Sequence, residues 1–406
     1  MFYNTCYMDY IIEKRTLSFF KKFNKPISVE LTEIFKTVSE IHFNARFNCN
    51  ISEGQIPNNV TKIYFGKYFN RDISFLPDSI EFINFGENFN KELKKLPQNL
   101  ITIRFGFRFK QYIKNIPKSV THIILDNDYK NKIILEHPLE SLVFGYNFNK
   151  DINLSKYLIE EITYGEDFNN DVNGYLPHNL KKLSFGRAFN NNLDNLPSNL
   201  TYLTLGDSFR ESLDRLPNNL RYLKLGYYYN GSLDMLPSSL EELYLGDCFN
   251  KTIDNLPNSL KTLSIGKMFN QPLNNLPDGL KKIFIDGKSD YSLDNLPDSI
   301  EFLSINGNYN KEINKYPNSL KFLVFDTGYM KCIKNLPETL EILALGFMAI
   351  KDGYIKNWDY KIIPEIVSLP KNIKYVYLNS LYPENNLINK YPNINFIYKT
   401  DFSPFL

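Results

Sequence analysis

Cysteine and histidine are scarce in this sequence, and neither recurs at a regular spacing. The cysteines form no CxxC pair, so neither a disulfide framework nor a cysteine-rich zinc site is predicted, and a reducing compartment is the default. The histidines occupy different positions of the repeat described below, so stacking cannot gather them as metal ligands. The cysteines are Cys6, Cys49, Cys248 and Cys332, and the histidines are His42, His122, His137 and His178.

An excess of one charge and long apolar runs are also absent. Lys and Arg number 47 against 45 Asp and Glu, which leaves a formal net charge of +2. Chains that bind nucleic acid or anionic membranes are usually far more basic. No apolar run is long enough for a membrane span, and the opening MFYNTCYMDYIIEKRTLSFF lacks the apolar stretch of a signal peptide. We therefore expect a cytoplasmic protein that binds neither nucleic acid nor membrane.

Motifs of catalytic and cofactor sites are missing as well. The phosphate loop GxxxxGK[ST] does not occur, and no Cys–His or Ser–His–Asp arrangement is suggested. A recurring aspartate might suggest a calcium ladder, but the glycine-rich loops of such ladders are missing, so we predict a solvated turn. These aspartates are Asp194, Asp214, Asp234, Asp254 and Asp294. We predict a non-enzymatic protein with no cofactor and no small-molecule substrate.

What the sequence does contain is a repeat of 20 residues. An apolar residue followed by proline marks each unit, and we number positions from that proline. Two coils without it begin at Glu136 and Lys156, a degenerate coil opens at Phe35, and the last begins at Pro370. The prolines are Pro57, Pro77, Pro97, Pro117, Pro177, Pro197, Pro217, Pro237, Pro257, Pro277, Pro297, Pro317 and Pro337. About seventeen coils are expected, each packing only on its neighbours.

Each unit carries one short stretch of alternating apolar residues, such as Leu203 and Leu205. Alternation predicts a strand, and one strand per short unit predicts a parallel sheet of stacked coils. Twenty residues cannot also hold a full helix, so the return path should be extended or a short 3₁₀ turn. The predicted fold is a leucine-rich-repeat-like solenoid with little helix outside the N-terminal segment.

Three further columns of residues recur in the unit. Glycine at position 9 is expected to make a positive-φ bend, an aromatic at position 12 to build a buried spine, and asparagine at position 13 to satisfy backbone groups at the turn. The glycines are Gly66, Gly86, Gly106, Gly186, Gly206, Gly226, Gly246, Gly266 and Gly346, replaced elsewhere by Asp126, Asp286, Asn306 and Asp326. Aromatics include Phe69, Phe89, Phe109, Phe189, Phe209, Tyr229, Phe249 and Phe269, and asparagines include Asn70, Asn90, Asn190, Asn250 and Asn270.

The spelling of the unit resembles the FNIP repeat, a relative of the leucine-rich repeat. The segments that carry the resemblance are LGDCFNKTIDNLPNSLKTLSIGKMFNQPL (245–273), IPNNVTKIYFGKYFNRDI (56–73) and IPKSVTHI (116–123). The resemblance implies a curved solenoid with a parallel sheet on one face. Such proteins are common in social amoebae and in giant viruses that infect amoebae, often with an F-box. The F-box implies a substrate receptor of a cullin-type ubiquitin ligase that holds a Skp-type adaptor, in the host cytoplasm if viral.

Three regions are expected along the chain. Residues 1–34 form an N-terminal cap, with a degenerate F-box as the alternative, because they lack the LPxxLLxxIxxxL opening. Residues 35–391 form the solenoid, with an insertion at about 347–369 that holds Trp358, and residues 392–406 form a C-terminal cap. Both ends of a solenoid core need covering.

The candidate binding surface is the outward side of the strands, where packing does not require large side chains. Aromatic and basic residues gather there on neighbouring coils, as at many protein interfaces. The predicted partner-binding residues are Tyr202, Tyr222, Lys224, Tyr244, Lys282, Phe284, Phe302 and Phe322. We predict a scaffold that recognises a protein partner, linked to ubiquitin ligation of host proteins. The alternative is a structural, self-assembling repeat protein without a ubiquitin role.

Overall fold

A computed structural model describes most of the chain, which divides into two compact units, Met1–Phe189 and Asn190–Leu406. The structure describes residues 10–20, 22–126, 129, 131, 133–287, 290–307, 309, 311–326, 328, 329, 331–346, 364–379 and 390–399. Trp358 and most of the predicted insertion, residues 347–363, lie outside this part, as do residues 1–9 and 400–406 of the predicted caps.

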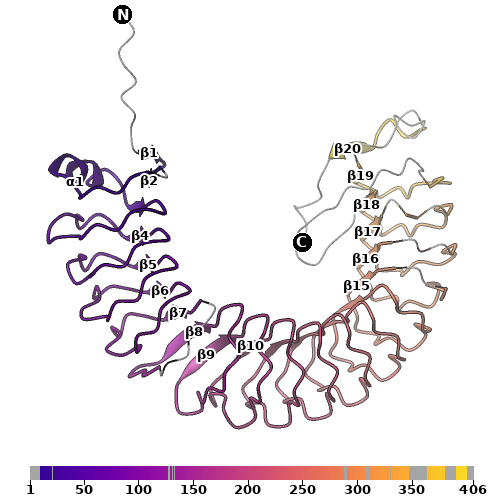
Figure 1. The fold of residues 1–406 in the computed structure, drawn as a ribbon. Helices are drawn as coiled ribbons and strands as arrows, with labels where there is room; N and C mark the ends of the chain where they lie inside the picture. The colour runs from indigo at the N-terminus through magenta and orange to yellow at the C-terminus, as the bar shows by residue number, and fades with distance from the viewer. Residues whose placement is uncertain are drawn as a thin grey trace, which may run out of the picture. The chain divides into compact units, whose positions relative to one another are not determined.

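The first unit is a stack of short parallel strands preceded by a hairpin. Strand β1 pairs with β2 antiparallel, β2 pairs with β3 in parallel, and parallel pairing then runs in chain order to β10. The elements are β1 (Tyr10–Glu13), β2 (Thr16–Phe19), α1 (Val29–Phe35), β3 (Glu40–His42), β4 (Lys62–Tyr64), β5 (Phe82–Asn84), β6 (Thr102–Arg104), β7 (His122–Ile124), β8 (Leu139–Val143), β9 (Ile159–Thr163) and β10 (Lys182–Ser184). Figure 1 shows these strands on one side of the unit and the return segments on the other.

The second unit repeats this arrangement from β11 to β20, again with parallel pairs in chain order. Its strands are β11 (Tyr202–Thr204), β12 (Tyr222–Lys224), β13 (Glu242–Tyr244), β14 (Thr262–Ile265), β15 (Lys282–Ile285), β16 (Phe302–Ile305), β17 (Phe322–Phe325), β18 (Ile342–Leu345), β19 (Tyr375–Asn379) and β20 (Asn395–Lys399). Leu203 lies opposite Leu223, and Leu223 opposite Leu243, so the register equals the repeat. The predicted parallel solenoid of about seventeen coils is confirmed, with one strand per coil from β3 to β19.

The core of each unit lies between the strands and the return segments. Leucine or isoleucine at position 6, such as Leu223, and the ring at position 12, such as Phe249, are fully buried. Rings of neighbouring coils stack, with 6.2 Å between the centroids of Phe249 and Phe269. The predicted aromatic spine is therefore confirmed.

The first unit holds a second aromatic column that the sequence analysis missed. Phe65 and Phe85 at position 8 stack on Phe69 and Phe89 of their own coils, with centroids 3.9 and 3.8 Å apart. In the second unit, leucine or isoleucine fills this position in most coils, as at Leu225. The signal in the sequence is a pair of aromatics four residues apart in each early unit.

The glycine column has a different cause from the one predicted. Only Gly346 among the nine predicted glycines has a positive φ, of 80°. At Gly226, a Cβ atom would lie 1.8 Å from the carbonyl oxygen of Gly206 on the preceding coil. The prediction of a left-handed bend is therefore wrong for most of the column, because glycine is required there by the close approach of neighbouring backbones.

The asparagine column forms a directed ladder of hydrogen bonds along the coils. The backbone N–H of Asn250 donates to Oδ1 of Asn230, and the N–H of Asn270 donates to Oδ1 of Asn250, both at 2.8 Å. The same bond joins Asn70 to Asn90 and Asn190 to the N–H of Arg210. Arginine can receive the bond but offers no acceptor to the next coil. The predicted role of the column in satisfying the turn backbone is confirmed.

The N-terminal segment adds strands and a short helix to the first unit. Helix α1 begins after Ser28, whose side chain accepts a hydrogen bond from the N–H of Leu31 at 3.3 Å, as an N-cap residue does. Phe35 at its end is fully buried. In the described part of the chain, no helix is long and apolar enough to cross a membrane.

Candidate protein-binding surface

The outward side chains of the strands form what we call the strand face, at positions 5 and 7 of each coil. All eight predicted partner-binding residues lie on this face of the second unit. They differ in exposure, because Lys282 is exposed, Phe302 is only 8% exposed, and the rest are partly buried. Those partly buried are Tyr202, Tyr222, Lys224, Tyr244, Phe284 and Phe322.

Three tyrosines form a continuous group across β11, β12 and β13. The rings of Tyr202 and Tyr222 stack with centroids 3.9 Å apart and planes within 10°, and the rings of Tyr222 and Tyr244 are 5.1 Å apart. The hydroxyl of Tyr244 donates to Oε2 of Glu242 at 2.8 Å. Burial, followed by the hydrogen bond with Tyr202, raises the pKa of Tyr222 far above its ordinary value. The group therefore presents neutral hydroxyls on an apolar platform.

The three phenylalanines belong to an apolar cluster further along the same face. Ring centroids of Phe284 and Phe302 are 5.1 Å apart, and those of Phe302 and Phe322 are 6.3 Å apart. Ile342 and Tyr377 pack into the same cluster and are buried. In-register pairing places large side chains of successive strands against one another, so they shield each other from water. The exposure expected for Phe302 is therefore wrong, while its contact with a partner stays a prediction.

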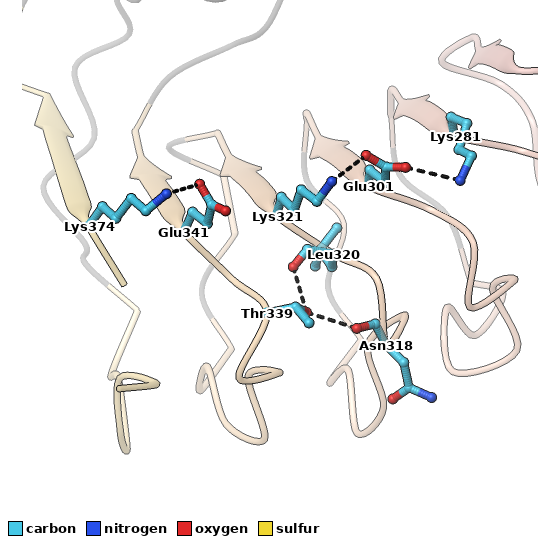
Figure 2. Close-up of polar contacts among 8 residues, drawn as sticks. All are labelled: Lys281, Glu301, Asn318, Leu320, Lys321, Thr339, Glu341 and Lys374. Carbon is cyan, nitrogen blue, oxygen red and sulfur yellow. Dashed lines mark hydrogen bonds and ion pairs between the residues drawn. The ribbon is translucent and has the colours of Figure 1, made fainter. Parts of the chain in front are cut away.

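A row of ion pairs borders the strand face at position 4, just before each strand (Figure 2). Glu301 accepts from Nζ of Lys281 at 3.0 Å and from Nζ of Lys321 at 2.8 Å, and Glu341 pairs with Lys374 at 2.7 Å. The hydrogen bonds from Lys321 and Lys281 lower the pKa of the Glu301 carboxyl. The sequence analysis missed this row, whose signal is charge of alternating sign at a spacing of 20 residues.

Hydroxyl groups fasten the turn that leads into this row. In Figure 2, the Oγ1 of Thr339 donates within 2.9 Å of the carbonyl of Leu320 and 2.8 Å of the carbonyl of Asn318. Ser239 makes the equivalent bond to the carbonyl of Leu220 at 2.6 Å. These bonds fix each turn to the preceding coil, so the strand face and the ion-pair row are held in register.

The first unit has an aromatic group on its own strand face. The rings of His42 and Tyr64 are 4.1 Å apart, and those of Tyr64 and Phe82 are 4.9 Å apart. Oε1 of Glu40 lies within hydrogen-bond distance of Nε2 of His42. Among the described residues, no three His, Cys, Asp or Glu side chains are grouped as metal ligands would be. The chemistry of both strand faces is therefore that of contact surfaces.

Comparison with known proteins agrees with the geometry of the coils. The FNIP repeat family matches residues 23–68, 47–88, 89–128, 168–208, 213–248 and 249–288, which together span more than half of the chain. A solved structure of CroV588, described as a novel circular LRR protein structure, is similar with a TM-score of 0.75 and 28% identity over 93% of this chain. The match covers 58% of the CroV588 chain, so the present sequence spans less than two thirds of that protein.

Two other solved structures are more distant. YopM from Yersinia enterocolitica gives a TM-score of 0.39 at 17% identity, covering 86% of this chain and 81% of that chain. The mouse RP105/MD-1 complex gives 0.49 at 15% identity, covering 92% of this chain and 87% of the other. No match was found among curated protein sequences. The spacing of the coils, their conserved chemistry along the chain and the matched segments together show that this chain belongs to the FNIP repeat family.

Proposed function

We propose that this protein is a non-enzymatic recognition scaffold that binds another protein through the strand face of its second unit. The observation that carries the proposal is the group formed by Tyr202, Tyr222 and Tyr244. Its rings stack outside the core of the coils, where packing of the fold does not require them. Tyrosines with an apolar body and a polar tip are typical anchors of protein interfaces.

We propose that the eight predicted residues contribute unequally. Lys224 and Lys282 would contact polar groups of the partner, and the three tyrosines would contribute the apolar area. Phe284 and Phe322 are partly buried against Phe302, so they would mainly support the shape of the face. A protein partner of this kind fits the leucine-rich-repeat-like architecture, whose stacked strands offer an extended surface.

We also propose that residues 1–34 and 392–406 cap the two ends of the array. The pairing of β2 with β3 and the burial of Phe35 support this role at the N-terminal end. A link to ubiquitin ligation would require residues 1–34 to hold a Skp-type adaptor as well. Recovery of Skp and cullin with the intact chain, and its loss on deletion of residues 1–34, would support that link.

The scaffold proposal is tested with a random-peptide display library selected on the intact protein. The test variant carries Tyr202→Thr, Tyr222→Thr and Tyr244→Thr, because threonine keeps strand propensity while removing the rings. The control variant carries Tyr146→Thr, Tyr227→Thr and Tyr228→Thr, whose side chains are exposed and lie outside the strands. We expect peptides that bind the wild type and the control but lose at least about tenfold in affinity on the test variant.

Circular dichroism and thermal unfolding of both variants show whether the fold is kept, and restoring phenylalanine at the three positions should recover most of the affinity. Equal peptide binding by the test and control variants would contradict the proposal. Concentration-dependent assembly without selected peptides would instead favour the structural, self-assembling alternative.

A further inference from the structure

Basic residues outnumber carboxylates on the strand face and ion-pair row of β12–β17. Over these six strands, positions 4, 5 and 7 hold six cations and three carboxylates. The cations are Arg221, Lys224, Lys261, Lys281, Lys282 and Lys321, and the carboxylates are Glu241, Glu242 and Glu301. A net charge of +2 for the whole chain conceals this local surplus.

The ion pairs concentrate the surplus at one place. Glu241 is shared by Arg221 at 2.7 Å and Lys261 at 3.3 Å, and Glu301 is shared by Lys281 and Lys321. Each carboxylate therefore neutralises one of two cations.

Lys261 and Lys281 follow one another on adjacent coils, because the N–H of Lys281 donates to the carbonyl of Lys261 at 2.9 Å. Lys282 beside them is exposed and has no ion-pair partner among the described residues. We call Lys261, Lys281 and Lys282 the lysine cluster. Asp278 lies in the turn before β15 rather than on the strand.

A narrow gap between aromatic rings lies next to the lysine cluster. Ser264 is paired in register with Tyr244 on one side and with Phe284 on the other. A small side chain between two rings leaves room for an apolar group of a ligand. Cations and an apolar slot are therefore neighbours on β13–β15.

Resting on the proposed function, we propose that the partner binds through an acidic segment whose carboxylates contact the lysine cluster and whose apolar side chain lies between Tyr244 and Phe284. Charge complementarity of this kind steers association and selects the partner. A single-stranded nucleic acid is the less favoured ligand. Its bases need open ring faces, whereas Tyr202 and Tyr222 cover each other's faces at 3.9 Å.

The test uses the peptides selected from the random-peptide library on wild-type protein. We expect them to be enriched in Asp and Glu, and to lose at least about fivefold in affinity on the variant Lys281→Gln/Lys282→Gln, measured by fluorescence anisotropy. The matched control Lys118→Gln/Lys251→Gln removes two exposed lysines away from the face and should change the affinity less than about twofold. Added salt should weaken wild-type binding more than binding by the test variant.

Failure of this inference can be distinguished from failure of the proposed function. Peptides that depend on the three tyrosines, but show no acidic enrichment or no loss on Lys281→Gln/Lys282→Gln, would keep the surface and overturn its acidic preference. Tighter binding of a single-stranded oligonucleotide than of a peptide with the same charge would also overturn it. Peptides insensitive to the tyrosine substitutions would refute the proposed function itself.

Discussion

At the scale of single residues, the coils are held together by groups that each serve the next coil. Oδ1 of Asn250 accepts the N–H of Asn270, and the carbonyl of Gly206 occupies the space that a side chain at Gly226 would need. The first is a requirement for an acceptor and the second a requirement for no side chain. Both requirements recur every 20 residues because neighbouring coils meet in the same way.

The glycine column gives a prediction at this scale. In Gly226→Ala, the added Cβ would lie 1.8 Å from the carbonyl oxygen of Gly206, so the coils must separate. We expect the free energy of unfolding to fall by about 1–3 kcal/mol or more, measured by chemical denaturation. Gly279→Ala is the control, because its Cβ would lie 3.3 Å from the nearest atom, a carbonyl oxygen of Asn258. Equal losses in the two variants would contradict the close-approach explanation.

The sequence predicted the buried residues well and the glycines for the wrong reason. Leucine alternation and the ring at position 12 reflect burial, which depends mainly on the residue itself and its place in the repeat. A glycine shows only that a side chain is unfavourable, and both a positive φ and a close neighbour produce that result. The distance to Gly206 depends on how two coils pack, which the pattern of one coil does not contain.

At the scale of elements, each strand is so short that its register relies on neighbouring groups. Strand β12 has three residues, and it is bordered by Arg221, which pairs with Glu241 of the next coil. The pairs at position 4 align one strand with the next, and the hydroxyl of Ser239 joins its turn to the preceding coil. Opposite charges on adjacent coils thus favour one pairing over a slipped one.

The ion pairs of Glu301 give a pH prediction for this row. Hydrogen bonds from Lys321 and Lys281 lower the pKa of Glu301 below its ordinary value of 4.5. Because the folded pKa is depressed, the stabilisation is complete above about pH 4.5 and is lost as the pH falls through the folded value. Glu301→Gln should lower the free energy of unfolding by about 0.5 kcal/mol at neutral pH, since the side chains are partly exposed.

The difference between wild type and Glu301→Gln should disappear below about pH 4, as followed by denaturant unfolding over a pH series. The control is Glu53→Gln, an exposed residue with no ion-pair partner among the described residues. A difference that persists in acid would show that the substitution acts through packing instead of charge.

The candidate site illustrates the limit of prediction at this scale. Period-two alternation assigned Tyr222 and Phe302 correctly to the outward side of their strands. The sequence did not distinguish their surroundings, because exposure depends on the residues stacked on either side. Phe302 lies between Phe284 and Phe322 and is shielded, whereas Lys282 remains exposed.

At the scale of the whole molecule, each unit is a stack in which a coil contacts chiefly its neighbours. Stability in such arrays is close to a sum over coils and their interfaces, so damage stays local. The stack of Tyr229, Phe249 and Phe269, with successive centroids 6.3 and 6.2 Å apart, is one such interface. The repeat makes this organisation predictable from sequence, whereas the relation between the two units follows from no single coil.

Local damage is the prediction at this scale. Phe249→Ala removes a fully buried ring, and about 3–5 kcal/mol of stability should be lost from the surrounding coils. Hydrogen exchange followed by mass spectrometry should show faster exchange in the coils that contain Tyr229 and Phe269. Exchange in the coils of the first unit should stay unchanged. Uniform acceleration along the chain would indicate that the array unfolds as one cooperative body.

The asparagine ladder also bears on how such a protein changes over generations. The acceptor on Asn230 serves whichever coil comes next, provided that coil has a backbone N–H at the same place. An in-frame duplication of one unit of the gene would therefore create a joint identical in chemistry to the old ones. Recombination can lengthen or shorten the array while the unlike side chains of the strand face are reshuffled, so the repertoire of targets can diversify without the architecture being reinvented.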